Sequence, residues 1–265
     1  MPRPPVLLLF ASLLTACPSR TPPERGVMLI ISKPEGRTDE VRATLDRRLA
    51  HLKLKAKLGE DGDTFSIRVA ADADLELIKK LVTTRGELRF CREATQTAKA
   101  WCELGRRDGL SALGDESCGV QGRTRDAVLA VLQPWADGGI AWETQADRTV
   151  VAWAADEDCR TPRITAAEVV EGQPALNVTF DRASADDFAK LTQKVLGQHL
   201  LIELDGEVQS APVVQSAITG GRAMLMVGPS HQSELEVLGA VLAGGPLPAL
   251  TVTKVQPYGP PSLTR

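Results

Sequence analysis

The sequence is poor in the residues on which several common functions depend. Aromatic residues make up 4% of its 265 positions, with a single tyrosine, so stacking surfaces for bases are not expected. The net charge is −3, which leaves no basic excess to neutralise phosphates. The three histidines, His51, His199 and His231, lie far apart and form no metal-ligand spacing. We therefore expect no nucleic-acid partner, no metal and no other cofactor.

Motifs of catalysis are also missing. The chain has no Gly-x-Ser-x-Gly elbow, no phosphate-binding loop and no paired cysteine and histidine. These absences favour a non-catalytic protein over an enzyme.

Hydrophobic runs are short as well, including the one near the N-terminus. The run from Val6 to Leu14 follows Arg3 and falls short of the roughly 20 residues that span a bilayer. Leu14-Thr15-Ala16-Cys17 comes next and resembles a bacterial lipobox. We therefore expect residues 1–16 to be a lipoprotein signal peptide and Cys17 to carry the lipid. The alternatives are an ordinary leader with an incidental cysteine, or a short anchor.

This start predicts the location of the protein. Residues 17–25 are polar and rich in proline and are expected to form a tether. The protein is then exported and lipid-anchored to the cell envelope membrane, where it faces the periplasm. The choice between inner and outer membrane stays open.

Four further cysteines lie between residues 91 and 159. An even number in an exported chain predicts two disulfides, for which three connectivities are possible. We favour the nested pairing of Cys91 with Cys159 and Cys102 with Cys118. A zinc site is the weaker alternative because no Cys-x-x-Cys is present.

Residues 26–90 alternate between strand and helix patterns. The branched run 26–32 predicts a buried strand, and apolar residues at helical spacing follow in 38–52. After a turn at Asp61-Gly62 come an alternating strand, a second helix and a strand that begins at Glu87. This β-α-β-α-β order predicts an α+β protein with a ferredoxin-like base and antiparallel or mixed sheets.

Residues 91–163 differ from both flanking regions. Glycine, charge and cysteine increase there and periodicity weakens. We expect one helix at 124–133, two strands at 139–144 and 149–155, and otherwise little regular structure. The region is interpreted as a cysteine-rich insertion that its disulfides stabilise.

Residues 164–250 again show clear patterns, and a returning strand and tail follow in 251–265. Thr165 and Glu168 fit a capping box and predict a helix start, while 175–180 alternates as a strand. Ser184 is the expected cap of the next helix, which Gly197 ends. Gly220-Gly221 predicts a turn into one more strand.

Asp205 raises the question of function most directly. It could be a catalytic carboxylate, a metal ligand or a turn residue. Asp205-Gly206 separates two strand-like runs, and this dipeptide is the strongest short signal of a hairpin. No histidine or second acid has an evident role beside it, since Glu203 and Glu207 are expected on the flanking strands, facing solvent or a partner. We therefore interpret Asp205 as a turn residue.

The motifs of this region together resemble the head of the first periplasmic domain of SecD, an accessory of bacterial protein export. The family pattern has a Thr-x-x-x-x-Gly helix end, Leu-Asp-Gly, Ala-Pro, Ile-x-Gly-Gly, a Leu-Pro helix end and Gly-Pro-Ser-Leu. The matching residues here are Thr192, Gly197, Leu204, Asp205, Gly206, Ala211, Pro212, Ile218, Gly220, Gly221, Leu242, Gly245, Leu247, Pro248 and 259–263.

The resemblance implies a role for a SecD-like soluble region. SecD has membrane helices that couple transport to protons, and this sequence shows none of them, so we expect lipid at Cys17 to replace the first membrane helix as anchor. Expected partners are unfolded exported polypeptides or components of the Sec translocase, with binding by strand addition. The second hypothesis is an envelope interaction protein that reuses the fold without an export role.

Overall fold

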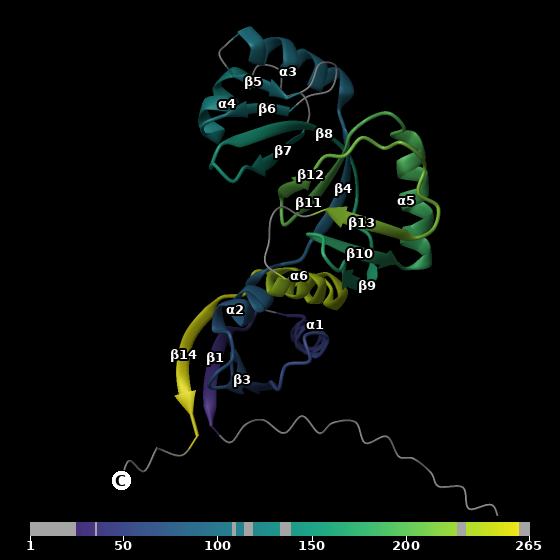
Figure 1. Cartoon of the computed structure of the whole chain (residues 1–265). Helices are drawn as coiled ribbons and strands as arrows, with labels where there is room; N and C mark the ends of the chain where they lie inside the picture. The colour runs from purple at the N-terminus through teal and green to yellow at the C-terminus, as the bar shows by residue number, and fades with distance from the viewer. Residues whose placement is uncertain are drawn as a thin grey trace, which may run out of the picture.

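The computed structural model describes residues 25–34, 36–107, 110–113, 119–132, 139–226 and 232–259. Three units follow one another from bottom to top in Figure 1: a ferredoxin-like unit, a three-stranded sheet with its helices, and a β-barrel that carries two further helices. The expected α+β class, with antiparallel and mixed sheets, is confirmed. No helix within these ranges is both long and apolar enough to cross a membrane.

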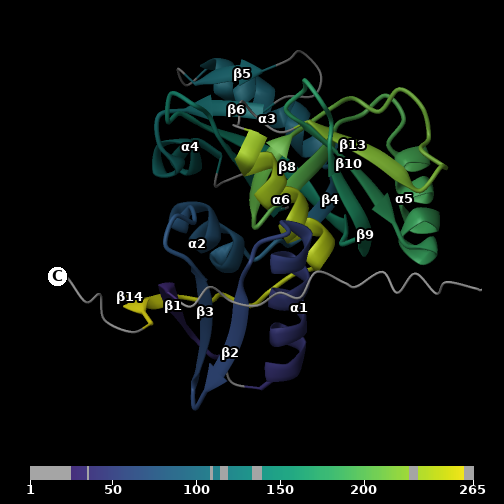
Figure 2. The same ribbon diagram turned by 60° about the horizontal axis from the view of Figure 1, so that its bottom comes forward.

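The ferredoxin-like unit has four antiparallel strands in the order β14-β1-β3-β2. Its elements are β1 (Gly26–Ser32), α1 (Thr38–His51), β2 (Lys57–Asp61), β3 (Thr64–Ala70), α2 (Leu75–Thr83) and β14 (Val252–Tyr258). Alternate residues of β1 and β3, such as Leu29 and Ile67, are fully buried under the helices. Helix α6 (Gln232–Gly244) packs on α1 and α2, so a late part of the chain completes this core (Figure 2).

Two strand assignments in this unit need correction. Residues 57–61 form a separate strand, which was missed because Leu58 and the half-buried Gly59 give no apolar alternation. Strand β4 (Leu88–Glu93) was expected to complete the β-α-β-α-β order of this unit. It instead pairs with β11 (Leu200–Leu204) and β8 (Val150–Arg160) in the seven-stranded sheet. The returning strand β14 takes its place beside β1, and Gly26 pairs with Tyr258. β4 contributes Leu88 and Phe90 to one core and Cys91 to another, so it divides two cores.

A closed barrel forms from strands that lie far apart in sequence. The seven-stranded sheet has the order β4-β11-β12-β7-β8-β6-β5, and β4 also pairs with β8. Five of these strands therefore form a ring: β4, β7 (Gly139–Thr144), β8 (Val150–Arg160), β11 (Leu200–Leu204) and β12 (Glu207–Ser210). Its interior is filled by Cys91, Ala141, Val151, Trp153, Ala155, Leu201 and Val208. A ring this small is filled by side chains and leaves no channel.

The cysteine-rich insertion is more regular than expected. Its helix α4 (Arg125–Leu132) matches the expected one, and its short strands β5 (Ser111–Leu113) and β6 (Gly119–Gly122) extend the barrel sheet. Helix α3 (Thr95–Arg107) was missed. It packs through Ala98 and the fully buried Trp101. Its buried residues Ala98, Trp101, Cys102 and Gly105 recur at helical spacing, a pattern that the sequence interpretation overlooked because three of the four are small.

The three-stranded sheet has the order β13-β10-β9, with β9 (Ile164–Val169), β10 (Ala175–Phe180) and β13 (Arg222–Met226). The capping box expected at Thr165 and Glu168 is wrong, since both residues lie in β9 and Thr165 donates a hydrogen bond to the carbonyl of Thr179. Helix α5 (Arg182–Lys194) is capped by Asp181, whose carboxylate accepts from the Ser184 amide at 2.9 Å. Ser184 itself accepts from the Arg163 amide, so it is not the cap.

Candidate functional site

The Asp205-Gly206 turn joins β11 to β12 as a tight hairpin. Both residues have positive φ, 54° and 86°, which is the conformation that a type I′ turn requires. The Asp205 carboxylate also accepts backbone hydrogen bonds from Arg85 at 3.0 Å and Glu87 at 2.8 Å. Asp205 is thus a turn residue that fixes the hairpin to the connection between α2 and β4.

Arg48 secures the same connection from the other side. Its side chain is fully buried and its guanidinium donates to the carbonyls of Leu81 (2.8 Å), Thr84 (2.6 Å), Arg85 (2.8 Å) and Gly245 (2.7 Å). Burial lowers the pKa of Arg48 to about 10, against the attraction of the Asp205 charge. Arg48 therefore stays a cation at neutral pH.

Two connections of the chain, here called crossings, pass beside Arg48: the one from α2 to β4, which leaves the ferredoxin-like unit, and the one from α6 to β14, which returns to its sheet. Arg48 binds carbonyls of both crossings. At Gly86 an added Cβ would lie 2.9 Å from the Arg48 Nη2, and at Gly244 it would lie 2.4 Å from the Arg48 Cγ. These close approaches require glycine, so the sequence of both crossings is fitted to Arg48.

Glu203 and Glu207 were expected to face solvent or a partner, and the structure places them differently from one another. The side chain of Glu203 is 6% exposed and lies opposite Arg89 of β4, with 3.6 Å between Oε2 and Nη1. Burial raises the pKa of Glu203, Arg89 opposes that rise and Glu87 adds to it. The sequence missed this burial because the barrel that encloses Glu203 closes through the distant pair β4–β8.

Glu207 instead connects the hairpin to the cysteine-rich insertion. Its carboxylate accepts from Arg125 of α4 and from the Thr144 hydroxyl of β7, the latter at 3.0 Å. The Arg125 guanidinium lies over the Trp142 ring at 5.3 Å from its centre. The partners of the Glu207 carboxylate are therefore residues of the insertion in the same chain.

An apolar groove lies beside the three-stranded sheet. The segment 212–218 forms one wall and β13 the other, over a floor from β4, α5 and β11, with a cavity volume of about 260 Å³. The lining residues are Phe90, Phe188, Leu200, Ile202, Pro212, Val213, Val214, Gln215, Ser216, Ile218, Ala223, Met224 and Leu225. Eleven of these thirteen are apolar, so the groove suits an apolar ligand.

Residues of the sequence motif build this wall. The Pro212 carbonyl accepts from the Leu200 amide at 2.9 Å. The hydroxyl of the buried Thr192 accepts from the Ile218 amide at 2.9 Å and donates to the Phe188 carbonyl. Gly221, at φ 64°, returns the chain into β13. The motif thus shapes the groove through backbone contacts, and sequence spacing alone did not show that cavity.

Exposed apolar side chains gather around the groove. Six large hydrophobic side chains are exposed in the described part of the chain. Two of them, Val213 and Met224, line the groove. Met226 lies two positions further along β13, and Leu196 forms a β-bridge with Val214 of the opposite wall. Met224 is 53% exposed and Met226 46%. β13 pairs only with β10 within the described ranges, so one of its edges faces away from the sheet beside these methionines.

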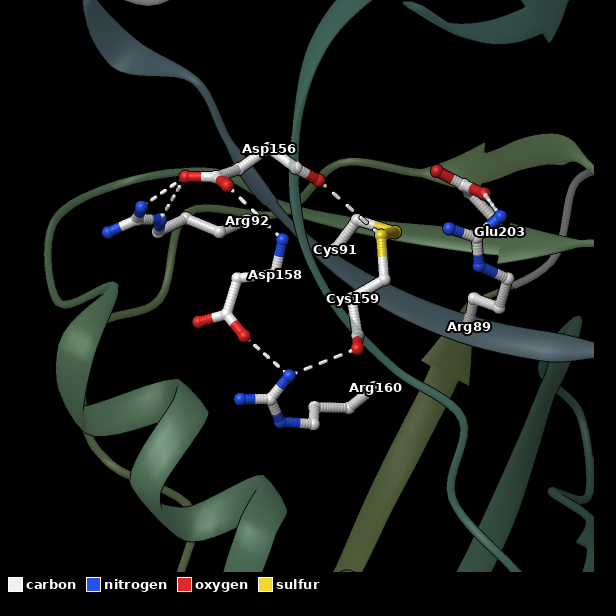
Figure 3. The surroundings of a disulfide bond; sticks show 8 residues. All are labelled: Arg89, Cys91, Arg92, Asp156, Asp158, Cys159, Arg160 and Glu203. Atoms are coloured by element: carbon white, nitrogen blue, oxygen red, sulfur yellow. Dashed lines mark hydrogen bonds and ion pairs between the residues drawn. A yellow bond between two sulfur atoms is a disulfide. The ribbon is translucent and has the colours of Figure 1, made fainter. Parts of the chain in front are cut away.

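A disulfide joins Cys91 of β4 to Cys159 of β8 (Figure 3). Cys102 is also disulfide-bonded, and its expected partner Cys118 lies outside the described residues, as does Cys17. Among the described residues, one group of three has the atom types and proximity of metal ligands: Cys91, Cys159 and Glu203. The two sulfurs are bonded to each other, so this group does not form a metal site while the disulfide is intact.

Part of the chain matches a known protein family. The family profile described as SecDF, P1 head subdomain, matches residues 155–249. That range holds the Asp205-Gly206 hairpin, Gly220-Gly221 and every groove residue except Phe90. Residues 91–154 lie outside this match.

Two curated relatives show the same similarity. The protein translocase subunit SecDF of Thermus thermophilus is 35% identical over 113 residues, which are 39% of this chain and 15% of the relative. The translocase subunit SecD of Magnetococcus marinus is 39% identical over 89 residues, 33% of this chain and 17% of the relative. The chain therefore covers less than a fifth of the length of either protein.

Two solved structures share the fold. SecDF in a super-membrane-facing form has 22% identity and a TM-score of 0.57, covering 88% of this chain and 30% of that one. A structure of SecDF, a membrane component that enhances protein export, has 21% identity and a TM-score of 0.54, covering 86% of this chain and 99% of that one. The expected resemblance to the SecD periplasmic region is thus confirmed for the fold and for the subdomain 155–249.

Proposed function

We propose that this protein is a non-catalytic, lipid-anchored component of the cell envelope that assists protein export by binding extended polypeptide. The observation that carries the proposal is the apolar groove between residues 212–218 and β13, which the exposed side chains of Val213 and Met224 line. The similarity of the chain to the translocase subunits SecD and SecDF supports a role in protein export.

The chemistry of the groove suits an unfolded client. A translocating chain exposes apolar side chains and unpaired backbone groups together. β13 offers a strand edge that pairs with an extended backbone, while the groove receives alternate side chains. Met224 and Met226 suit many sequences, because methionine is flexible and polarisable. Binding therefore depends little on the client sequence.

The remaining parts of the proposal concern placement. Lipid on Cys17 would hold the protein at the membrane, and residues 17–25 extended would reach about 30 Å. β1 begins at Gly26 and β14 ends at Tyr258, side by side, so the ferredoxin-like unit would lie nearest the membrane and the groove farther out (Figure 1). Components of the Sec translocase are the proposed protein partners.

A binding experiment tests the groove. The ligand is a reduced, carboxymethylated polypeptide that stays unfolded and carries a fluorescent label. We expect the double variant Met224→Glu/Met226→Glu to bind it about tenfold more weakly, because charge replaces apolar contact. The matched control is Val255→Glu, at a side chain that is 40% exposed on β14 of the ferredoxin-like unit.

Equal affinity of the wild type, the double variant and Val255→Glu for the unfolded polypeptide would contradict the proposed site. The competing function, an envelope interaction protein without an export role, is favoured by the insertion that the family profile does not match. It predicts that none of the three proteins binds unfolded polypeptide and that one folded envelope protein binds the insertion.

A further inference from the structure

The Cys91–Cys159 disulfide closes the insertion at its two ends. Cys91 lies in the strand that enters the insertion and Cys159 in the strand that leaves it, 68 residues later. Cys91 is fully buried, whereas Cys159 is partly exposed. An incoming reagent would therefore reach the Cys159 sulfur first.

A buried carboxyl group lies directly beside this bond. A carboxylate oxygen of Glu203 and the two sulfurs all lie within 4.8 Å of one another. The Glu203 side chain is buried and points into the barrel, on the same face as Cys91. Neither the turn motif nor the proposed polypeptide groove explains an acid in this position.

We propose that Cys91–Cys159 is a redox-active disulfide that a dithiol protein opens, with Cys159 as the attacked sulfur and Glu203 as the proton donor to Cys91. The partner class is a thiol–disulfide oxidoreductase in its dithiol form. This assignment is independent of the polypeptide groove.

The chemistry balances as an exchange of two electrons. A thiolate of the dithiol attacks the Cys159 Sγ and forms a mixed disulfide, while the bond to Cys91 breaks. The Cys91 thiolate leaves and takes the proton of the Glu203 carboxylic acid. The second thiol of the partner then displaces Cys159, which takes a proton from solvent. The partner ends as a disulfide and this chain as two thiols, and Glu203 regains its proton from solvent.

The surroundings of Glu203 fit a proton donor. Burial keeps the carboxylic acid form available by raising its pKa, and Glu87 acts in the same direction. Arg89 at 3.6 Å would stabilise the carboxylate once its proton has gone. From β12, the paired residue is the apolar Val208. These groups favour proton release toward a thiolate inside the barrel.

Glu93, two residues from Cys91 on the same face of β4, is also buried, but among the described residues Glu203 is the acid grouped with both sulfurs within 4.8 Å. The charged side chains outside the barrel near the disulfide are paired with one another. Arg92 binds Asp156 on β8, with 3.0 Å between Nε and Oδ2. Asp158 pairs with Arg160, and Lys194 lies 3.8 Å from it. Figure 3 shows the Arg92–Asp156 pair and the Arg89–Glu203 pair on either side of the sulfurs. Glu203 is therefore the carboxyl group placed to serve Cys91.

Opening the disulfide would loosen the barrel. The β4–β8 seam has three paired positions, Phe90 with Arg160, Cys91 with Cys159, and Glu93 with Ala155, and the register shifts between the last two. One of these pairs is the disulfide itself. Reduction would leave a short, irregular ladder to hold the insertion at its ends, and the insertion would gain freedom to move.

The test compares rates of reduction by dithiothreitol at several pH values, with Cys91 and Cys159 followed by alkylation and mass spectrometry. We expect Glu203→Gln to be reduced about tenfold more slowly than the wild type at pH 5 to 6, because its amide has no proton to give. The ratio of the two rates should approach one as pH rises and Glu203 ionises. The control Asp158→Asn, which removes a charge next to Cys159 outside the barrel, should behave as wild type.

A second measurement needs no variant. Reduced glutathione, a monothiol, is added to the wild-type protein and its mixed disulfide is mapped. The expected adduct is on Cys159. Equal rates for wild type and Glu203→Gln at every pH, or an adduct on Cys91, would overturn the proposal and leave a purely structural disulfide.

Discussion

The ferredoxin-like unit and the barrel are stabilised by different means. The first has a large, mainly aliphatic core under three helices and a buried arginine that binds carbonyls of both crossings. The second has a narrow interior with two alanines among seven side chains, and a disulfide across its seam. A unit that buries much apolar surface needs no covalent link, whereas a small core gains most from one.

The hairpin at Asp205 belongs to both regions. Its strands β11 and β12 are part of the barrel, and its turn is bonded to the backbone beside Arg48. β4 and β11 also separate the barrel interior from the groove, since Cys91 and Leu201 face one side while Phe90 and Leu200 face the other. Substitutions at the hairpin are therefore expected to affect the stability of both the ferredoxin-like unit and the barrel, whereas substitutions within one core should affect mainly that region.

The largest expected effect comes from Arg48. Arg48→Met should lower the free energy of unfolding by about 4 kcal/mol, because four backbone carbonyls lose a buried donor. Urea unfolding followed by circular dichroism measures it. The neighbouring Arg47→Met is the control, since Arg47 donates to one carbonyl, that of Gly244, and to Thr44. A loss as large for Arg47 as for Arg48 would contradict the account of the crossings.

Removing the Cys91–Cys159 disulfide should have the next largest effect, and only on the barrel. The free energy of unfolding of the variant Cys91→Ala/Cys159→Ala should be lower by about 3 kcal/mol, because the unfolded chain regains the conformational freedom of a long loop. Hydrogen exchange should accelerate in β7 and β8 and stay unchanged in β1 and β3. Equal acceleration in both regions would show that they unfold as one unit and would remove the distinction between them.

Asp205→Ala should lower the free energy of unfolding by about 2 kcal/mol, since it removes two hydrogen bonds to backbone amides and places alanine at positive φ. Asp205→Asn should cost less than half as much, because asparagine tolerates that φ and keeps one acceptor oxygen. Urea unfolding of both variants tests the assignment. If both cost the same, the turn conformation plays no part and Asp205 acts through its charge.

The smallest expected effect is the pH dependence from Glu203. Its folded-state pKa is raised, so its contribution to stability is present below the ordinary glutamate pKa and is lost as pH rises through the raised value. The unfolding free energy of the wild type relative to Glu203→Gln should therefore fall as pH rises. A constant difference across the acidic and neutral range would show that Glu203 ionises normally.

Local signals predicted the hairpin well. Asp205-Gly206 requires two positive φ angles, and no other part of the fold is needed to deduce that. The strands 26–32 and 175–180 were predictable for a similar reason, since their own alternation or branching identifies them. The class of the fold followed from these elements.

The groove and the buried acid could not be predicted in this way. The groove joins Phe90, Phe188 and the segment 212–218, which are separated by up to 128 positions and meet only in the folded chain. In the sequence, Glu203 is a single acid in the apolar run of β11, and its burial follows only when β4 pairs with β8 and closes the barrel. The missed helix α3 and the wrong helix start at Thr165 show the same limit, because tertiary packing overrides local propensity.

The measurement that tests the central claim most directly is photo-crosslinking in living cells. A photoreactive residue replaces Met224 beside the groove in one protein and Val255 on β14 in another, and the adducts are identified by mass spectrometry. The account predicts many different exported polypeptides linked to position 224 and few to position 255. A single folded protein at position 224, or the same mixture at both positions, would contradict it.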